Sequence, residues 1–516
     1  MLVAVAIPLE RPILNACHPR LTFLITPLDR LHAARQKLYI SGSGAIWKKP
    51  FSCGIMIATM RTNRPPSPLR HSLMTPFPIY DLETARKTIL QRRGWAETEY
   101  PDSLLDGIEG IFGERLTPDQ AVARVLADIR REGDAGLHRW TERIDGVRTS
   151  TYAVPPEAWN AALDRIDSDL REALWTAADR IATFHRRQPA HSWIHQDEEG
   201  SLGQLVRPLD SVGVYVPGGS APLPSSLLMA AIIARVADVK RVIAMTPPDR
   251  TTGRIPDVIL AAAAIAEIDE LYALGGAQAI GAMAFGTESI EPVDKIVGPG
   301  GLFVTLAKRQ VFGAVGIDGL PGPTETIVIA DDSAHPGMVA ADLLAQAEHD
   351  ILATAILLTP SQELAEAVQA EVEARMETLS RAQIIAQSLS ARGGAVITPD
   401  LVAAVAEANR FAPEHLCLSV ADPWALVPLV RHAGGVFVGE SSFEVLGDYI
   451  AGPSHIMPTE GTARYASPLN VEDFVKRISL IALTPEAGAA LSAVAARIAD
   501  TEGLDAHAAS ARERML

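Results

Sequence analysis

The sequence predicts an α/β protein made of two Rossmann-like domains with parallel sheets, a helical N-terminal segment and a helical C-terminal tail. One observation is the repeated order of strand, helix and strand with short connections, which builds parallel sheets with right-handed crossovers. The other is that this order occurs both before and after the stretch GLPGPTET. An apolar strand ends in Thr-Pro in each run, RVIAMTPP and TAILLTPS, which hints at two similar units, although strand ends often carry turn residues.

A helix is expected ahead of the first run, in the stretch LTPDQAVARVLADIRREGDAGLHRWTERID. Thr117 is a suitable N-cap, Pro118 fits the first helical position, and Asp119 places an acid in the first turn. Apolar residues then recur at helical spacing.

The first run of alternating elements reads as strand, Gly-rich turn, helix and strand, expected at residues 212–216, 225–237 and 241–245. It continues with IDELYALGG as a strand, GAQAIGAMAFG as a helix and VDKIVGPGG as a strand. The second run has TIVIADD as a strand, GMVAADLLAQAEHD as a helix and ATAILLTPS as a strand. We therefore expect a first α/β domain from residues 74–213 and 324–483, a second from residues 214–323, and a helical tail at 484–516.

Composition narrows the classes of function. The 516 residues are 48% hydrophobic and 21% charged, which is enough apolar material for more than one core. A net charge of −16 and 5% aromatic residues argue against nucleic-acid binding. The three cysteines share no metal-ligand spacing and are too few for a disulfide framework, which favours a reducing, cytoplasmic location. No apolar run is long enough to span a bilayer.

The first 73 residues differ from the rest of the chain in charge. They carry ten Lys or Arg residues against two acidic residues, whereas the whole chain is acidic. An organellar transit peptide would explain such an Arg-rich, acid-poor start. A start codon assigned too far upstream of Met56, Met60 or Met74 is the interpretation that we favour.

Gln346 and His349 stand three residues apart in a predicted helix, so both side chains should project from one face. An amide and an imidazole form a workable half-site for a divalent metal. Zinc needs further ligands, and a solvated helix end is the alternative interpretation.

A long loop, GESSFEVLGDYIAGPSHIMPTEGTARYASPLN, also carries candidate residues. Loops of this length are usually functional or disordered, and its many apolar residues argue against disorder. Asp448 could supply a carboxylate to a metal and His455 could contact a substrate. A loop-stabilising aspartate and a surface histidine are equally open. Near the C-terminus, Glu502 and His507 lie on a short predicted helix and mean little in isolation.

Glu414 and His415 stand side by side in the apolar stretch FAPEHLCLSV. A buried acid and imidazole are costly unless they are paired or used. Pro413 should push Ala412 toward an extended conformation and deliver both side chains at the mouth of an apolar strand. Burial there would move both pKa values toward neutrality for proton transfer, whereas a salt-bridged pair at a sheet edge is the alternative.

Glycine-rich turns offer places for a nucleotide, although no strict GxGxxG motif follows a strand. The stretches VPGGSAPL, LGGAQAIG and VGPGGLF each put glycines after a strand, so a dinucleotide could bind at the helix N-termini there. Ordinary turn glycines explain each stretch equally well.

Taken together, these residues resemble the histidinol dehydrogenases, the zinc- and NAD-dependent enzymes of histidine biosynthesis. The resemblance rests on long motifs that occur in the family's order from about Met74 onward, and residues 1–73 have no counterpart. The motifs are YVPGGSAPLPSSLLM, GGAQAIGAMAFGTES, VDKIVGPGG with AKRQV, GPTETIVIADDSA, AADLLAQAEHD, RFAPEHL, LGDYIAGPSHIMPTEGTARY and EGLDAH.

The resemblance implies that L-histidinol is oxidised through its aldehyde to L-histidine by two NAD molecules, with His415 as general base and Glu414 activating water. It places the metal and catalytic residues in the first domain and NAD in the second. The implied zinc ligands are Gln346, His349, Asp448 and His507, the last reaching across a homodimer from the tail. The implied substrate contacts are Thr324, Gln346, His349, His415, Asp448, His455, Glu502 and His507, and the implied cofactor contacts are Tyr215, Gln278 and Gly301.

Four positions depart from the family's pattern. Gly301 stands where an asparagine that touches the nucleotide is common, and Thr324 replaces a usual serine. Ser454 and Glu460 stand in the substrate loop where asparagine and glycine are common. These departures leave room for a paralogue that uses zinc and NAD on another small hydroxylated substrate. A zinc hydrolase and a non-catalytic binding protein are disfavoured, the first because the ligand set leaves no open water position.

Overall fold

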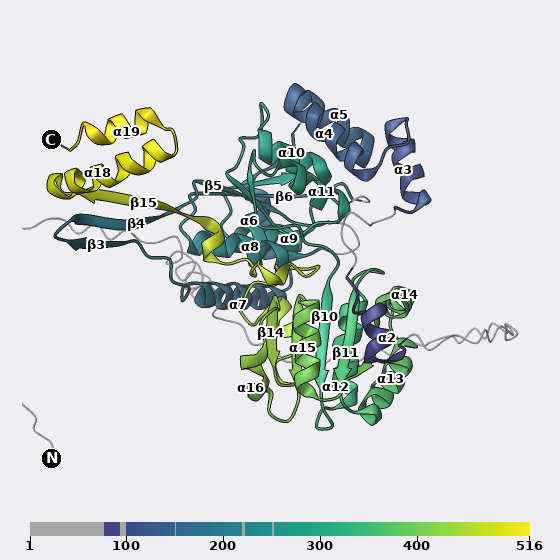
Figure 1. Cartoon of the computed structure of the whole chain (residues 1–516). Helices are drawn as coiled ribbons and strands as arrows, with labels where there is room; N and C mark the ends of the chain where they lie inside the picture. Colours follow the sequence, from purple (N-terminus) through teal and green to yellow (C-terminus); the bar gives the residue numbers. More distant parts are fainter. Residues whose placement is uncertain (1–76, 93–99, 150, 219–221, 250–251, 516) are drawn as a thin grey trace, which may run out of the picture. The chain divides into compact units, whose positions relative to one another are not determined.

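The computed structural model describes residues 77–92, 100–149, 151–218, 222–249 and 252–515 (Figure 1). The N-terminal segment 1–73, with its two alternative explanations, lies outside these ranges. Within them the strands form two six-stranded sheets and one three-stranded sheet, and helices cover the two larger sheets.

The first sheet is parallel throughout and has the order β1-β12-β11-β10-β13-β14. Its central strand β10 comes first in the C-terminal run, the next two strands lie on one side of it, and the last two lie on the other. This is the order of a doubly wound sheet. The strands are β1 (Ile79–Asp81), β10 (Glu325–Ala330), β11 (Thr354–Thr359), β12 (Gly393–Ile397), β13 (His415–Ser419) and β14 (Gly435–Val438).

The second sheet repeats the same plan, with the order β2-β7-β6-β5-β8-β9. It is parallel except for β2, which runs antiparallel to β7. The equivalent order confirms the prediction of two Rossmann-like α/β units. The strands are β2 (Ala153–Val154), β5 (Ser211–Tyr215), β6 (Arg241–Thr246), β7 (Glu270–Ala273), β8 (Lys295–Val297) and β9 (Gly316–Ile317).

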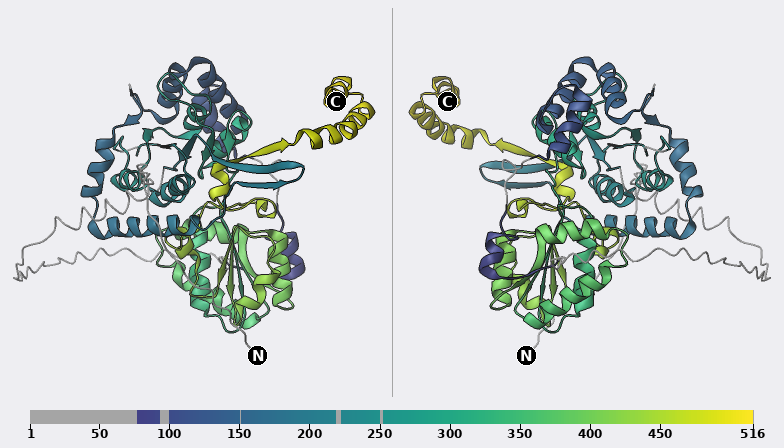
Figure 2. Two further views of the ribbon diagram at one scale, coloured as in Figure 1. Left: turned by 90° about the vertical axis from the view of Figure 1, so that its left-hand side faces the viewer. Right: turned by 90° about the vertical axis from the view of Figure 1, so that its right-hand side faces the viewer.

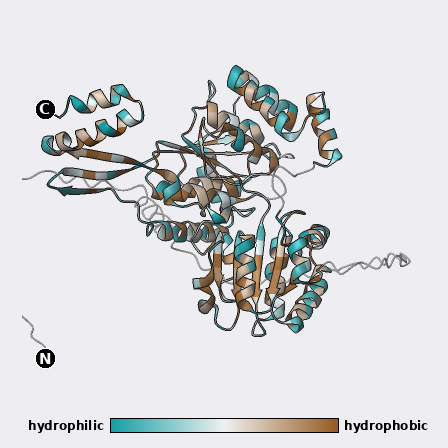
Figure 3. Cartoon of the chain, viewed as in Figure 1, coloured by the Kyte–Doolittle hydropathy of each residue, from teal (hydrophilic) through white to brown (hydrophobic). Residues whose placement is uncertain are grey.

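Helices lie on both faces of the first sheet (Figure 2). Alternate residues of each strand point to opposite faces, so Val328 packs against α12 to α14 whereas Ile327 and Ile329 pack against α2 and α15. Figure 3 shows the strands of this sheet as strongly hydrophobic. The helices are α2 (Leu82–Lys87), α12 (Pro336–Ala347), α13 (Gln362–Met376), α14 (Ala382–Arg392), α15 (Leu401–Phe411), α16 (Pro423–Leu426) and α17 (Glu444–Tyr449), with the 3-10 turns η2 (Val427–Leu429), η3 (Thr462–Arg464) and η4 (Val471–Phe474).

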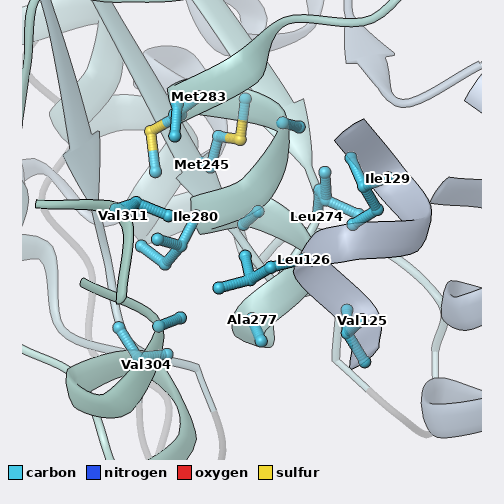
Figure 4. Close-up of a cluster of buried hydrophobic side chains, with 14 of the residues drawn as sticks. Val125, Leu126, Ile129, Met245, Leu274, Ala277, Ile280, Met283, Val304 and Val311 are labelled. Carbon is cyan, nitrogen blue, oxygen red and sulfur yellow. The ribbon is translucent and has the colours of Figure 1, made fainter. Parts of the chain in front are cut away.

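The second sheet shares its core with the N-terminal helices. Leu126 and Ile129 of α4 belong to the same buried cluster as Ile280 of α10 (Figure 4). The two helices approach closely at Gly281, where a Cβ would lie 3.1 Å from Leu126 and 3.2 Å from Ile129. The helices around this sheet are α3 (Asp102–Phe112), α4 (Pro118–Glu132), α5 (Asp134–Asp145), α6 (Pro156–Arg165), α7 (Ser168–His185), α8 (Pro224–Val236), α9 (Asp257–Ile265), α10 (Gly276–Phe285) and α11 (Leu302–Val311).

The expected helix of residues 117–145 begins as predicted but is two helices. Thr117 accepts a hydrogen bond from the backbone of Gln120, whose side chain bonds back to Thr117, so a full capping box starts α4. Gly133 then separates α4 from α5 with a φ of 56°, in the left-handed region that glycine adopts without strain. The periodicity continues across the break because both helices bury an apolar face in the same core.

The structure divides residues 74–213 differently from the expected domain boundaries. Only β1 and α2 join the first sheet, while β2 is a strand of the second sheet and α3 to α5 pack on that sheet. A third, antiparallel sheet was not expected and has the order β15-β4-β3. It consists of β3 (Trp193–Asp197), β4 (Gly200–Pro208) and β15 (Val475–Leu483). The sequence pattern placed these segments in the first domain. It could not show this sheet, because β15 pairs with β4, a strand far away in the chain.

The helical tail begins where the sequence predicts. Thr484 caps the N-terminus of α18 (Pro485–Thr501), which packs against α19 (Asp505–Arg512). Among the described residues, no helix is both long enough and apolar enough to cross a lipid bilayer.

Candidate active site

Glu414 and His415 stand at the amino end of β13, as expected, and both are buried. The expected extended conformation of Ala412 is wrong, because Ala412 has a φ of 55° and caps α15 in the left-handed region. Its backbone N–H donates to the carbonyl of Ala408, so the helix end rather than Pro413 decides its conformation. The strained turn brings the chain from α15 directly into β13.

The Glu414 carboxylate is held by the amino end of the neighbouring strand β10. The Thr324 hydroxyl donates to Oε2 at 2.6 Å, and the backbone N–H of Glu325 donates to the same oxygen at 3.2 Å. Burial raises the pKa of Glu414 to about 7, although His415 and Thr324 oppose the shift. A carboxyl group with this pKa exchanges protons readily near neutral pH.

The His415 imidazole lies on the face of the sheet that α12 covers. Its Nδ1 is 3.0 Å from Nε2 of Gln346 and 3.3 Å from the carbonyl oxygen of Glu325. The ring of Phe437 packs beside it, with 5.8 Å between the ring centroids. Burial alone would lower the pKa of His415, but nearby carboxylates, of which Glu444 has the largest effect, raise it to about 10.

Helix α17 brings two acids to the two nitrogens of this imidazole. Asp448 Oδ1 lies 3.7 Å from Nε2, and Glu444 Oε1 lies 3.7 Å from Nδ1. Gly447 permits this approach, because a Cβ at that position would lie 2.6 Å from the ring of Phe437. Burial would raise the pKa of Asp448, yet the His415 imidazole holds it below its usual range.

The sequence-predicted metal ligands are brought together only in part. Gln346 is buried at the end of α12, and its Nε2 also donates to Thr324 Oγ1 at 2.5 Å. His349 is exposed just beyond the helix, not on it, since α12 ends at Ala347. His507 is exposed on α19. The described ranges contain no preformed group of three His, Cys, Asp or Glu side chains in metal-binding geometry.

The residues around His415 nevertheless have the chemistry of a zinc site. His349 and His455 both lower the pKa of Asp448 through their charge, so two imidazoles and a carboxylate lie within electrostatic reach of one another. Nε2 of His415 is buried and has no hydrogen-bond partner within the described structure. An amide, an imidazole and a carboxylate form a donor set whose chemistry suits zinc.

The loop that follows α17 connects the two sheets. Nδ1 of His455 is 2.8 Å from the carbonyl oxygen of Asp448, and its Nε2 is 3.5 Å from Ser226 Oγ on α8. The buried Ser454 hydroxyl donates to the carbonyl oxygen of Met229, also on α8. His455 is partly buried and not an ordinary surface histidine. The first turns of a helix of the second sheet therefore meet the loop of the first.

A cavity of about 1160 Å³ opens at the carboxyl ends of β5 and β6. This edge of a doubly wound sheet is where nucleotides bind. Tyr215 and Gln278, two of the expected cofactor contacts, both line the cavity. The backbone N–H of Gly276 donates to the Tyr215 hydroxyl, and burial raises the pKa of Tyr215 to about 12. Gln278 is buried, and its Nε2 donates to Asp145 at 2.9 Å.

Gly301, the third expected cofactor contact, is the N-cap of α11. It does not line the cavity, but Phe303 of the same helix does. Nothing lies within 4 Å of the place where a Cβ would stand, and a φ of −71° suits any residue. The preceding Gly298 is different, because its Cβ would lie 2.2 Å from the carbonyl oxygen of Tyr215. Glycine therefore lets this turn press against β5.

Sequence reasoning missed several residues that hold the site. Glu444 precedes the Gly-Asp pair by one helical turn, and the i to i+4 spacing to Asp448 was the available signal. Arg92 binds Glu325 and the carbonyl oxygens of Phe411 and Ala412, behind the candidate catalytic dipeptide Glu414-His415. No local pattern marks Arg92, because its partners lie more than 200 positions away in the chain.

A buried acid and imidazole at the end of one parallel sheet and a nucleotide-sized cavity at another are features of a dinucleotide-dependent α/β dehydrogenase. The family model described as histidinol dehydrogenase matches residues 114–515. The chain therefore belongs to the histidinol dehydrogenase family, and the resemblance seen in its motifs is confirmed. Members of this family are NAD-dependent oxidoreductases that act on CH–OH and aldehyde groups.

Individual histidinol dehydrogenases are similar to this chain over most of its length. It is 49% identical over 436 residues to the histidinol dehydrogenase of Deinococcus radiodurans, covering 84% of this chain and 99% of that protein. It is 50% identical over 394 residues to that of Thermus thermophilus, covering 76% and 94%. The crystal structure of histidinol dehydrogenase from Elizabethkingia anophelis superposes with a TM-score of 0.77 at 33% identity, covering 86% of this chain and 98% of that one.

Proposed function

We propose that this chain oxidises L-histidinol to L-histidine in two NAD-dependent steps through the aldehyde, the final reaction of histidine biosynthesis. The observation that carries the proposal is the buried catalytic dipeptide, with an acid whose pKa is about 7 beside an imidazole at the mouth of β13. Family membership supplies the reaction class, and the printed names of the relatives suggest the substrate.

The two side chains take different steps. In its unprotonated form, His415 accepts the hydroxyl proton of the alcohol while a hydride leaves the carbinol carbon for the first NAD, which gives an aldehyde and NADH. Glu414 then takes a proton from water as the water oxygen bonds to the aldehyde carbon. The hydrate gives its hydride to a second NAD, and the carboxylate remains. Because Glu414 and His415 are adjacent, one bound substrate can undergo both oxidations without release.

Zinc is part of the proposal, with Gln346, His349 and Asp448 as ligands from one chain and His507 from a second copy. When bound, the metal would hold the imidazole and amine of the substrate rather than activate water. Thr324, His455 and Glu502 are proposed to contact the substrate. Thr324 already bridges Gln346 and Glu414, so it can align the substrate with both.

The NAD molecule is proposed to occupy the cavity above β5 and β6. Tyr215, with its raised pKa, stays protonated and can donate a hydrogen bond, and the fixed amide of Gln278 can accept one. Gly301 contributes backbone only. The contact between α8 and the His455 loop supports transfer of hydride between the two sheets, since it brings the cofactor side next to the catalytic side.

A homodimer with a shared site is proposed from the tail. Large apolar side chains are exposed on β15 and α18, among them Ile481 at 72%, Val494 at 59% and Ile498 at 56%. Exposed apolar patches of this kind mark protein interfaces. Mixing a His507→Ala chain with a His415→Ala chain tests the proposal: activity should return in the mixed dimer, and its absence would count against a shared site. A cytoplasmic location stays a prediction.

The test of the substrate is NADH formation by zinc-loaded protein with L-histidinol, beside other small amino alcohols. We expect histidinol to be used with the highest kcat/KM. The rival is a paralogue that keeps zinc and NAD but oxidises another alcohol. The observation that favours this rival is Glu460, which stands in the substrate loop with a φ of 53° at a position where the family commonly has glycine. NADH from another alcohol and none from histidinol would select the rival, and NAD-independent hydrolysis would revive a zinc hydrolase.

A further inference from the structure

Besides Glu414, a second buried acid, Glu444, stands against the imidazole of His415. Glu444 is only 2% exposed, and its Oε2 accepts a hydrogen bond from Thr326 Oγ1 at 2.7 Å. Thr326 is the register partner of His415 on the neighbouring strand β10. A buried carboxylate costs several kcal/mol of desolvation unless its surroundings compensate. Within the described ranges the compensating groups are the Thr326 hydroxyl and the imidazole of His415, and both are buried.

The placement of Glu444 is set by one turn of helix. Glu444 and Asp448 are four residues apart on α17, so both side chains leave the same face. Each reaches a different nitrogen of the ring, Nδ1 for Glu444 and Nε2 for Asp448, both at 3.7 Å. Phe437 closes one side of the ring and α12 contributes Gln346 at another. A carboxylate thus lies beside each polar edge of the imidazole, close enough for a charge interaction but beyond hydrogen-bond distance.

We propose that Glu444 is a positioning residue for His415, one that acts through the imidazole and does not touch the substrate. Thr326 fixes the Glu444 carboxylate, the carboxylate fixes the Nδ1 edge of the ring, and the ring is then aimed for proton transfer. Without Glu444 that edge would keep only Gln346 and the Glu325 carbonyl, and the ring could turn about its Cβ–Cγ bond. The inference rests on the proposed role of His415 as general base.

Glu444→Gln is the direct test, because glutamine keeps the shape and can still accept from Thr326. The matched control is Glu440→Gln, which removes the same charge four residues earlier, where Oε1 of Glu440 accepts from the backbone of His335. We expect Glu444→Gln to lower kcat with histidinol about 10- to 100-fold while KM for NAD changes less than about twofold. Glu440→Gln should leave both constants unchanged.

A double variant separates positioning from a merely structural role. In a His415→Gln background, Glu444→Gln should have no further effect on the residual rate, because the residue through which it acts is gone. An equal loss in both backgrounds, or an unchanged kcat in the single variant, overturns the proposal. If Glu444→Gln does not fold, Thr326→Val replaces it. That variant leaves the carboxylate unanchored and should lower kcat by a smaller factor, again only when His415 is present.

A spectroscopic readout keeps this inference separable from the proposed function. In protein labelled with 13C-histidine, the ring signal of His415 is identified by its absence from His415→Gln. It should shift or broaden in Glu444→Gln and stay unchanged in Glu440→Gln. A moved signal in a protein that makes no NADH from histidinol would sink the function and leave the positioning role standing. If wild type forms NADH from histidinol but Glu444→Gln shows an unmoved His415 signal and an unchanged kcat, the proposed function stands and the positioning role of Glu444 falls.

Discussion

The clamp behind the catalytic dipeptide can be removed by one substitution, Arg92→Met. Both terminal nitrogens of the Arg92 guanidinium bind the Glu325 carboxylate. Its Nε donates to the carbonyl oxygen of Phe411 at 2.7 Å, and Nη2 donates to that of Ala412 at 3.2 Å. Glu325 in turn gives its backbone N–H to Glu414. Arg92 therefore supports both the strained turn before Glu414 and the strand that holds its carboxylate.

The loss of stability expected for Arg92→Met follows from the burial of Glu325. The Glu325 side chain is 6% exposed, so losing Arg92 leaves a buried charge unpaired, which costs about 3 to 5 kcal/mol. The two carbonyl oxygens lose their donor as well, at about 1 kcal/mol each where water does not replace it. Release of the turn should also displace Glu414, and a shift of about 1 Å at a catalytic group costs roughly 100-fold in rate.

Denaturant unfolding and steady-state kcat measure the two effects separately. Arg86→Met is the matched control, because Arg86 pairs with the buried Glu407 on the same side of the sheet but away from the dipeptide. It should lower the free energy of unfolding while leaving kcat unchanged. Adding Glu325→Gln to Arg92→Met should restore part of the stability, since no charge is then left buried. A free energy of unfolding within about 1 kcal/mol of wild type, with unchanged kcat, would refute the reasoning.

Three further predictions concern single positions. Burial, and then the charge of Glu440, raises the pKa of Asp342 from 3.8 to about 6, so the native state holds this proton more tightly and stability should fall as pH rises from about 4 to 6. Asp342→Asn should remove that fall and be roughly 3 kcal/mol more stable than wild type at pH 8 but equal at pH 4, and pH-dependent unfolding curves that coincide would disprove it. Gly447→Ala should push α17 away from Phe437 and lower both kcat and zinc affinity, and unchanged zinc titration and turnover would count against this account of the glycine. Gly301→Asn should fit without strain, improve the cap of α11 by a few tenths of a kcal/mol and lower KM for NAD, whereas a raised KM would contradict the open space found there.

Strand and helix patterns predicted the repeated α/β plan because each buried strand is a short apolar run bounded by turn residues. The pairing of distant segments was not predictable in this way. Nothing local to Val475–Leu483 indicates that it pairs antiparallel with Gly200–Pro208, and nothing in Asp102–Asp145 indicates which sheet it covers. Those choices depend on complementary surfaces that meet only in the folded chain.

In the candidate site, too, local sequence patterns predicted some residues, whereas contacts between distant segments could not be predicted. Glu414 and His415 stand out because an acid and an imidazole are costly within an apolar stretch. The conformation of Ala412 was misjudged because the residue closes a helix, and many helices end on a left-handed residue; here that residue is alanine instead of the usual glycine. For Glu444 the sequence offers only its i to i+4 spacing to Asp448. Its proximity to Nδ1 of His415 depends on the packing of α17 beside β13, which no local pattern predicts.

The most direct test of the divided roles is a single-turnover count of NADH in Glu414→Gln, with excess NAD and limiting L-histidinol. Wild type should form two NADH per histidine. The variant keeps His415, the proposed base, but lacks the group proposed to activate water, so it should form one NADH per histidinol and stop at the aldehyde. Two NADH at the wild-type rate from the variant would contradict the assignment of water activation to Glu414, and the account of this site would fall with it.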